Sequence, residues 1–222
     1  MNKLLIIVSI LSIILFIIVK LKLKHKNNIN NPFRSVWNRD SKAELGNLIS
    51  HFHKFCQDRK LAYSLFYGSL LGHQRHHKKL IPWDDDADCC VSDKIHECYT
   101  KLETDKIGIT KYKNYYKIYL KKNPQIKNYP WSWPFLDIFP IHMINQKNMI
   151  IPPFPKIKLS ISDVFPTKLS TIENNPVMIP AKPEKLLTIW YGPKWRSVCM
   201  SGSWRHRTES PIQNHTKLCK DV

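Results

Sequence analysis

The hydrophobic and polar positions divide the chain into an apolar N-terminal run, a short polar link and a long segment in which helix and strand patterns alternate. Residues 4–19 are apolar except for two serines. That length is just enough for a helix to span a bilayer, which takes about 20 residues. No small-residue cleavage pattern follows Val19, so we expect residues 1–23 to form an uncleaved transmembrane helix and not a signal peptide.

The link over residues 24–40 is polar and rich in asparagine, and we expect it to be a stalk. Lysines that follow the apolar run favour a cytoplasmic position for the rest of the chain. A glycosylation sequon at Asn214 is usable only on the opposite side. We therefore expect a single-pass membrane protein, of the Golgi or the endoplasmic reticulum, with the side of its folded domain left open.

The rest of the chain carries patterns of both helix and strand. An apolar stripe at helical spacing, opened by a capping-box pattern of Ser41 and Glu44, predicts a helix over residues 41–59. The elements expected next are a strand at 62–67, a short helix at 70–76, a strand at 86–91, a helix from 92 to about 103, and strands at 112–122 and 133–141. Such a mixture in one chain predicts an α/β (α+β) domain with a sheet and flanking helices.

Prolines become dense after residue 150, which predicts irregular structure wrapped over the core. This stretch is expected to close with a helix over residues 183–191 that stops at Gly192. Residues 201–222 are polar, and we expect them to form a tail outside a domain that covers residues 41–200.

Composition adds an electrostatic feature. The chain has 222 residues, of which 43% are hydrophobic, so it can bury one core. Its net charge is +18, from 35 Lys and Arg against 17 Asp and Glu. Such a charge attracts phosphates, nucleotides, nucleic acid or acidic membranes, although a general bias toward lysine explains it equally well. Six cysteines lack regular spacing, so neither a zinc ribbon nor a disulfide framework is indicated, and Cys89 and Cys90 are expected to be small buried residues.

Against this basic background, one short acidic run stands out. Asp84, Asp85, Asp86 and Asp88 lie among apolar residues and not among the polar residues that usually surround a solvated acidic run. In an extended chain, alternate side chains share a face, so Asp85 is separated from the other three. Carboxylates crowded on one face raise each other's pKa, and a bound divalent cation relieves that repulsion.

A further carboxylate, Asp137, lies inside the apolar strand predicted at 133–141. A buried aspartate without a partner costs several kcal/mol, so Asp137 is expected to have a cation or hydrogen-bond donors nearby. Together with Asp86 and Asp88 it would form an oxygen-only site suited to Mg²⁺ or Mn²⁺, and two such ions could clamp a phosphoryl displacement. The Gly68-Ser69 pair offers backbone N–H groups to a phosphate, which alone is weak evidence.

These residues resemble the signature of the LicD family, which includes bacterial phosphocholine transferases and the animal proteins fukutin and fukutin-related protein. The resemblance rests on Tyr-Gly-Ser-Leu-Leu-Gly at 67–72 and Ile-Pro-Trp-Asp-Asp-Asp-Ala-Asp at 81–88. It continues in Phe-Leu-Asp-Ile-Phe-Pro at 135–140, Asp-Val-Phe-Pro at 163–166, and Tyr-Gly followed by Trp195, and so covers residues 43–195.

The resemblance implies a nucleotidyltransferase-like mixed sheet. It also implies transfer of a substituted phosphate, such as phosphocholine or ribitol phosphate, from a CDP-activated donor to a hydroxyl of a glycan or glycoprotein. By position, the metal ligands and catalytic residues would be Asp86, Asp88 and Asp137, and the donor-binding residues would be Gly68, Ser69, Arg75 and Asp84. Ala87 is smaller than the residue usual in the family at that place. Because the chain is compact, its recognition of the acceptor is expected to differ from that of the larger animal members of the family.

Three other hypotheses remain. A glycosyltransferase with an Asp-x-Asp metal site would use a nucleotide-sugar. A nucleic-acid-binding protein would fit the charge, but the expected membrane anchor makes nucleic acid an unlikely partner. An inactive membrane scaffold would not need the three carboxylates, all of which are present.

Overall fold

The computed structural model describes residues 13–20, 31–151 and 157–222. The chain divides into two compact units, Met1–Arg34 and Ser35–Val222. In the first unit, residues 13–20 are helical and exposed. No helix within the described ranges is both long and apolar enough to cross a membrane. The anchor expected over residues 1–23 lies mostly outside the described residues and stays a prediction.

The centre of the second unit is a five-stranded sheet with the strand order β1-β2-β5-β4-β3. Its strands are β1 Tyr63–Leu65, β2 Ala87–Val91, β3 Ile107–Tyr112, β4 Tyr115–Leu120 and β5 Phe135–Pro140. The β2–β5 pair is parallel and the other three pairs are antiparallel. The mixed sheet with helices confirms the predicted fold class at that level.

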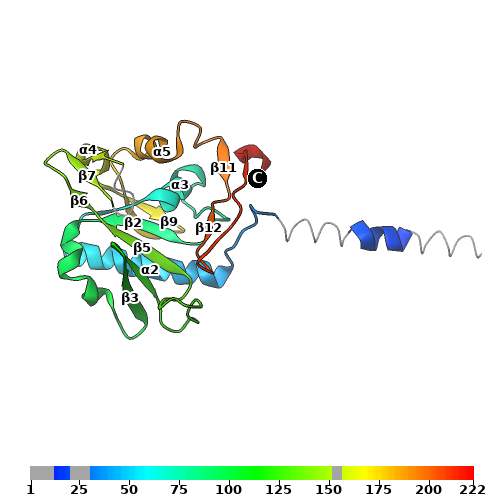
Figure 1. The fold of residues 1–222 in the computed structure, drawn as a ribbon, viewed down its shortest axis with the longest axis horizontal. Helices are drawn as coiled ribbons and strands as arrows, with labels where there is room; N and C mark the ends of the chain where they lie inside the picture. Colours follow the sequence, from blue (N-terminus) through cyan, green and yellow to red (C-terminus); the bar gives the residue numbers. More distant parts are fainter. Residues whose placement is uncertain (1–12, 21–30, 152–156) are drawn as a thin grey trace, which may run out of the picture. The chain divides into compact units, whose positions relative to one another are not determined.

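Three longer helices flank the sheet (Figure 1): α2 Arg39–Asp58, α3 Tyr67–Arg75 and α5 Pro183–Tyr191. Helix α2 crosses behind the sheet in that view and contacts β4 and β5, whereas α3 and α5 lie side by side and α3 contacts β2. The shorter helices are α4 Ile161–Val164, η1 Asp93–Glu97, η2 Tyr99–Leu102 and η3 Cys219–Asp221. Where one helix was expected over residues 92–103, two short 3₁₀ turns occur.

The start of α2 differs from the prediction. The capping box is formed by Asn38 and Ser41, because the Ser41 N–H donates to Asn38 Oδ1 and the Asn38 N–H donates to Ser41 Oγ. Glu44 instead reaches Lys122 and Asn123. The predicted apolar stripe is confirmed, since its leucine, isoleucine and phenylalanine side chains are buried.

Several small sheets surround this centre, including some within the proline-rich stretch expected to be irregular. Their strands are β6 His142–Met143, β7 Asn148–Ile150, β8 Leu159–Ser160, β9 Lys168–Ile172, β10 Asn175–Ile179, β11 Val198–Met200, β12 Trp204–Arg205, β13 Ser210–Pro211 and β14 Thr216–Leu218. Strands β9 and β10 form a hairpin whose two turn residues, Glu173 and Asn174, both have positive φ. That conformation matches the right-handed twist of the two strands and closes a tight turn.

The C-terminal segment is folded, although its sequence predicted a polar tail. Strand β14 pairs with β11, and the Cys199–Cys219 disulfide joins the same two regions. The cysteine spacing does not indicate this bond. The two cysteines meet only because the C-terminal end of the chain returns to pair with β11. Cys89 and Cys90 are buried free thiols, as predicted.

Candidate metal centre

The register of the central sheet lines up three charged residues on one face. Asp88 on β2 is paired with Asp137 on β5, and Asp137 is paired with Lys117 on β4. Residues opposite each other in neighbouring strands point to the same side, so Lys117, Asp137 and Asp88 form a row. Asp86 lies two positions before Asp88 and joins the row by the same alternation.

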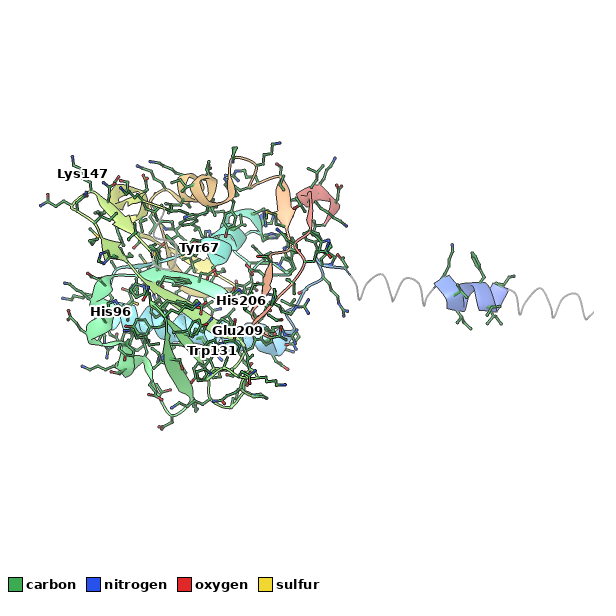
Figure 2. All side chains as sticks on the ribbon, in the orientation of Figure 1. Tyr67, His96, Trp131, Lys147, His206 and Glu209 are labelled. Atoms are coloured by element: carbon green, nitrogen blue, oxygen red, sulfur yellow. A yellow bond between two sulfur atoms is a disulfide. The ribbon has the colours of Figure 1, made fainter. Side chains whose placement is uncertain are left out.

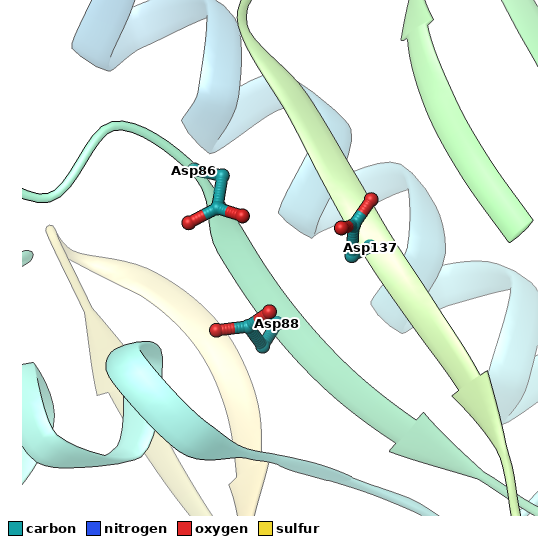
Figure 3. Close-up of side chains that lie close together, drawn as sticks. All are labelled: Asp86, Asp88 and Asp137. Carbon is teal, nitrogen blue, oxygen red and sulfur yellow. The ribbon is translucent and has the colours of Figure 1, made fainter. Parts of the chain in front are cut away.

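Asp86, Asp88 and Asp137 each offer a carboxylate oxygen, and these oxygens lie within 4.8 Å of one another. Figure 3 shows Asp86 just before strand β2, Asp88 on that strand and Asp137 on its neighbour, with the three side chains gathered together. All three residues are buried. Hard oxygen ligands in a cluster of this size fit Mg²⁺ or Mn²⁺.

The electrostatics of this cluster also favour a bound cation. Burial raises the pKa of Asp86 and of Asp88 well above the usual range, and the neighbouring carboxylates add to that rise. Burial also raises the pKa of Asp137, although the ion pair with Lys117 opposes it. The pKa of Asp84 rises to about 6, chiefly through burial. A divalent cation would favour the ionised form of each of these groups.

The two other aspartates of the acidic run have separate environments. A Cβ atom on Gly68 would collide with Asp84 Oδ2, so a larger residue there would require the Asp84 carboxylate to move. The Asp85 carboxylate accepts hydrogen bonds from the backbone N–H groups of His206 and Arg207, at 3.1 and 2.9 Å. Asp85 therefore holds the C-terminal segment, in agreement with its predicted separation from the other three.

Three of the predicted donor-binding residues, Gly68, Arg75 and Asp84, line one cavity, and Ser69 is not among its lining residues. Gly68 lines the cavity at the start of α3. The Ser69 hydroxyl accepts a hydrogen bond from the Asp88 N–H at 2.8 Å and so ties α3 to β2. Arg75 also lines the cavity, but its Nη1 donates to the carbonyls of Trp195 and Val198. Much of its hydrogen-bonding capacity is thus used to hold the segment that leads into β11.

The cavity above the carboxylates has a volume of about 650 Å³. Aromatic side chains form much of its wall. Tyr67 contacts Phe139 and Trp190, with ring centroids 5.7 and 4.9 Å apart, and Tyr115 stacks on Phe139. The acidic floor and aromatic wall can accommodate a phosphate-bound cation beside an apolar or cationic organic group.

Two residues of the C-terminal segment reach the site, and the sequence did not predict them. His206 Nε2 lies 3.3 Å from Asp86 Oδ2, and Glu209 lies 3.7 Å from Lys117 (Figure 2). Among the described side chains, His206 Nδ1 is the buried polar atom without a hydrogen-bond partner. The Trp-Arg-His-Arg run at 204–207 is the sequence feature that separates this segment from an ordinary polar tail.

Comparison with known proteins places this geometry in a family. Residues 60–182, more than half of the chain, match the family described as LicD/FKTN/FKRP, nucleotidyltransferase domain. The chain belongs to this family. Over 42 residues it is also 50% identical to the lipopolysaccharide cholinephosphotransferase LicD of Haemophilus influenzae. That stretch covers 19% of this chain and 16% of the relative, so the chain spans a small part of that protein's length.

The LicD match contains all three clustered aspartates, Lys117 and the start of α3. It ends before α5 and before the C-terminal segment that carries His206 and Glu209. The two residues that the sequence failed to predict therefore lie outside the matched range.

Proposed function

We propose that this protein is a metal-dependent phosphotransferase that moves a substituted phosphate from a CDP-activated donor to a hydroxyl of a glycan or glycoprotein. The observation that carries the proposal is the in-register pair of Asp88 and Asp137, which with Asp86 forms a buried oxygen cluster on the floor of a cavity. Membership of the LicD family supports a phosphotransferase-type reaction at this cluster.

Asp86, Asp88 and Asp137 would hold Mg²⁺ or Mn²⁺. When bound, such an ion neutralises phosphate charge and favours departure of the leaving nucleotide. Gly68 places the N-terminus of α3 at the cavity, and the partial positive charge of that helix end suits a phosphate group. Asp137, which shares the floor with Asp86 and Asp88, is the candidate to accept the proton of the acceptor hydroxyl.

The aromatic wall of the cavity favours phosphocholine over ribitol phosphate as the transferred group. A quaternary ammonium group is attracted to the faces of tyrosine and tryptophan, whereas a polyol gains less from these surfaces. Tyr67, Tyr115 and Trp190 line the cavity together with the carboxylates. The Haemophilus influenzae relative is named a cholinephosphotransferase, which agrees with this preference.

We further propose that the apolar residues near the N-terminus anchor the protein to a membrane, close to a glycan acceptor. This proposal rests on the length and hydrophobicity of residues 4–19. Limited proteolysis of the protein in sealed vesicles would test the anchor and also report the side on which the folded unit lies.

The reaction can be tested by incubating the full chain with Mn²⁺, a panel of glycan acceptors and three donors: CDP-choline, CDP-ribitol and a UDP-sugar. We expect release of CMP together with a labelled glycan, because transfer of the substituted phosphate leaves CMP. CDP-choline should react fastest. If only the UDP-sugar reacts and UDP is released, the protein is an Asp-x-Asp glycosyltransferase and the proposal is wrong.

A further inference from the structure

Lys117 is an unusual residue for the floor of this cavity. Its side chain is 1% exposed, and its Nζ donates to both oxygens of Asp137, at 2.7 and 2.9 Å. The same ammonium group lies 3.6 Å from the centroid of the Phe135 ring. Burial of a lysine is costly, and these contacts hold the Lys117 side-chain nitrogen against one of the proposed metal ligands.

The sheet order fixes the side of Asp137 on which this charge lies. Strand β5 has β2 on one side and β4 on the other, so Asp137 lies between Asp88 and Lys117 along the row. A metal ion held by Asp86, Asp88 and Asp137 would lie toward β2. A second ion on the β4 side of Asp137 would meet the Lys117 side-chain nitrogen there.

The C-terminal segment keeps Lys117 in this position. The Glu209 carboxylate lies 3.7 Å from Lys117 Nζ. Glu209 is held in turn by the indole N–H groups of Trp131 and Trp204, each at 2.9 Å. The charges therefore alternate from Glu209 to Lys117 to Asp137. Within the described part of the chain, the clustered carboxylates without a lysine partner are Asp86 and Asp88.

We propose that Lys117 is a built-in cation of the active site, which takes the place of a second divalent ion and limits the carboxylate cluster to one metal ion. Glu209 is the positioning residue for Lys117. The inference rests on the proposed metal-dependent function and adds the number of ions and the residue that sets it.

Counting bound Mn²⁺ tests the inference without any substrate. The full chain is titrated with Mn²⁺ in detergent, and free Mn²⁺ is measured by electron paramagnetic resonance. We expect one ion per chain in the natural protein and two in Lys117→Met, which shortens the side chain by one atom and removes its charge. The matched control is Lys121→Met, which removes a lysine from a surface ion pair with Glu103 and should leave one ion bound.

The outcomes separate the inference from the function on which it rests. Two ions in the natural protein, or one ion of unchanged affinity in Lys117→Met, would overturn the inference and leave the phosphotransferase proposal intact. Absence of any bound ion in the natural protein would overturn both. If Lys117→Met does not fold, Glu209→Gln is the second variant. It leaves Lys117 less neutralised, so Mn²⁺ affinity should fall about tenfold, and an unchanged affinity would contradict the inference.

Discussion

The carboxylate cluster and Asp163 are both buried, but the charges that surround them differ in sign balance. Asp163 on α4 is 2% exposed and forms ion pairs with Lys182 and Lys185, at 2.9 and 2.8 Å. The metal-centre cluster has three buried carboxylates, and Lys117 is the lysine that pairs with it among the described residues. One carboxylate thus pairs with two lysines, whereas three carboxylates share one lysine.

This difference determines the direction of the pKa shifts. Burial alone would raise the pKa of Asp163, but the hydrogen bonds from Lys185 and Lys182 outweigh it and lower the pKa. In the metal centre, burial and mutual repulsion raise the pKa of Asp86 and Asp88. A balanced buried carboxylate is typical of a structural role, whereas an unbalanced cluster could hold a cation from solution.

The largest expected difference between the two places is in catalysis. Asp88→Asn should reduce turnover at least about 1,000-fold, because an amide is a poor substitute for a charged metal ligand. Turnover of a CDP-linked donor measures the effect, and circular dichroism checks that the fold is kept. Normal turnover in this variant would show that Asp88 is not a ligand.

The matched change at the balanced site should act on stability instead. Asp163→Asn removes the charged partner of two lysines and should lower the free energy of unfolding by about 1–3 kcal/mol. Turnover per folded molecule should stay within about threefold of the natural protein, since a role in the fold has no part in the reaction. Urea denaturation measures the stability and donor turnover measures the activity. A folded but inactive variant would show that Asp163 also takes part in the reaction.

The pH dependence of stability should have opposite signs at the two places. Asp84 has a raised pKa of about 6 against its usual 3.8, so its folded form holds a proton more tightly than the unfolded chain does. Its contribution to stability is present below the usual pKa and is lost as the pH rises through about 6. Asp163 has a lowered pKa, so its contribution is present above the usual value and is lost as the pH falls further.

Added Mn²⁺ should therefore raise the melting temperature more at pH 8 than at pH 5, because protons compete with the metal for the carboxylates. Thermal denaturation with Mn²⁺ or with a chelator measures this difference. An equal effect at both pH values would mean that the raised-pKa carboxylates are not the binding site.

The smallest effect is expected for the loss of one of the two lysines that pair with Asp163. Lys185 is 56% exposed in its side chain, and Lys182 still pairs with Asp163 when Lys185 is absent. Lys185→Gln should therefore change the free energy of unfolding by only about 0.5 kcal/mol, with less effect in high salt. If Lys185→Gln lowered the free energy of unfolding as much as Asp163→Asn, Lys182 alone would not be enough to stabilise the Asp163 carboxylate.

Local patterns in the sequence predicted a large part of the fold. The apolar stripe of α2 and the proline and glycine that bound α5 are local signals, and both helices form within a few residues of the expected limits. Asp137 was singled out because a carboxylate in an apolar strand needs a partner, and the structure provides that partner in Lys117. The β9–β10 hairpin was missed because prolines and lysines obscure its strand pattern.

The partners of the metal centre depend on contacts between distant parts of the chain. Lys117 is one of many lysines in a strand that looks half exposed, and only the pairing of β4 with β5 brings it to Asp137. His206 and Glu209 reach the site because Asp85 binds the backbone of their segment and the Cys199–Cys219 disulfide joins β11 to the chain end. No pattern within one short segment carries that information.

We expect a divalent ion to bind among Asp86, Asp88 and Asp137 and not at the buried Asp163. Anomalous scattering from crystals grown with Mn²⁺ tests this directly. We predict a manganese peak about 2.1 Å from an oxygen of each of the three aspartates, and none beside Asp163. A cluster without a peak at saturating Mn²⁺, or a peak beside Asp163, would contradict the account.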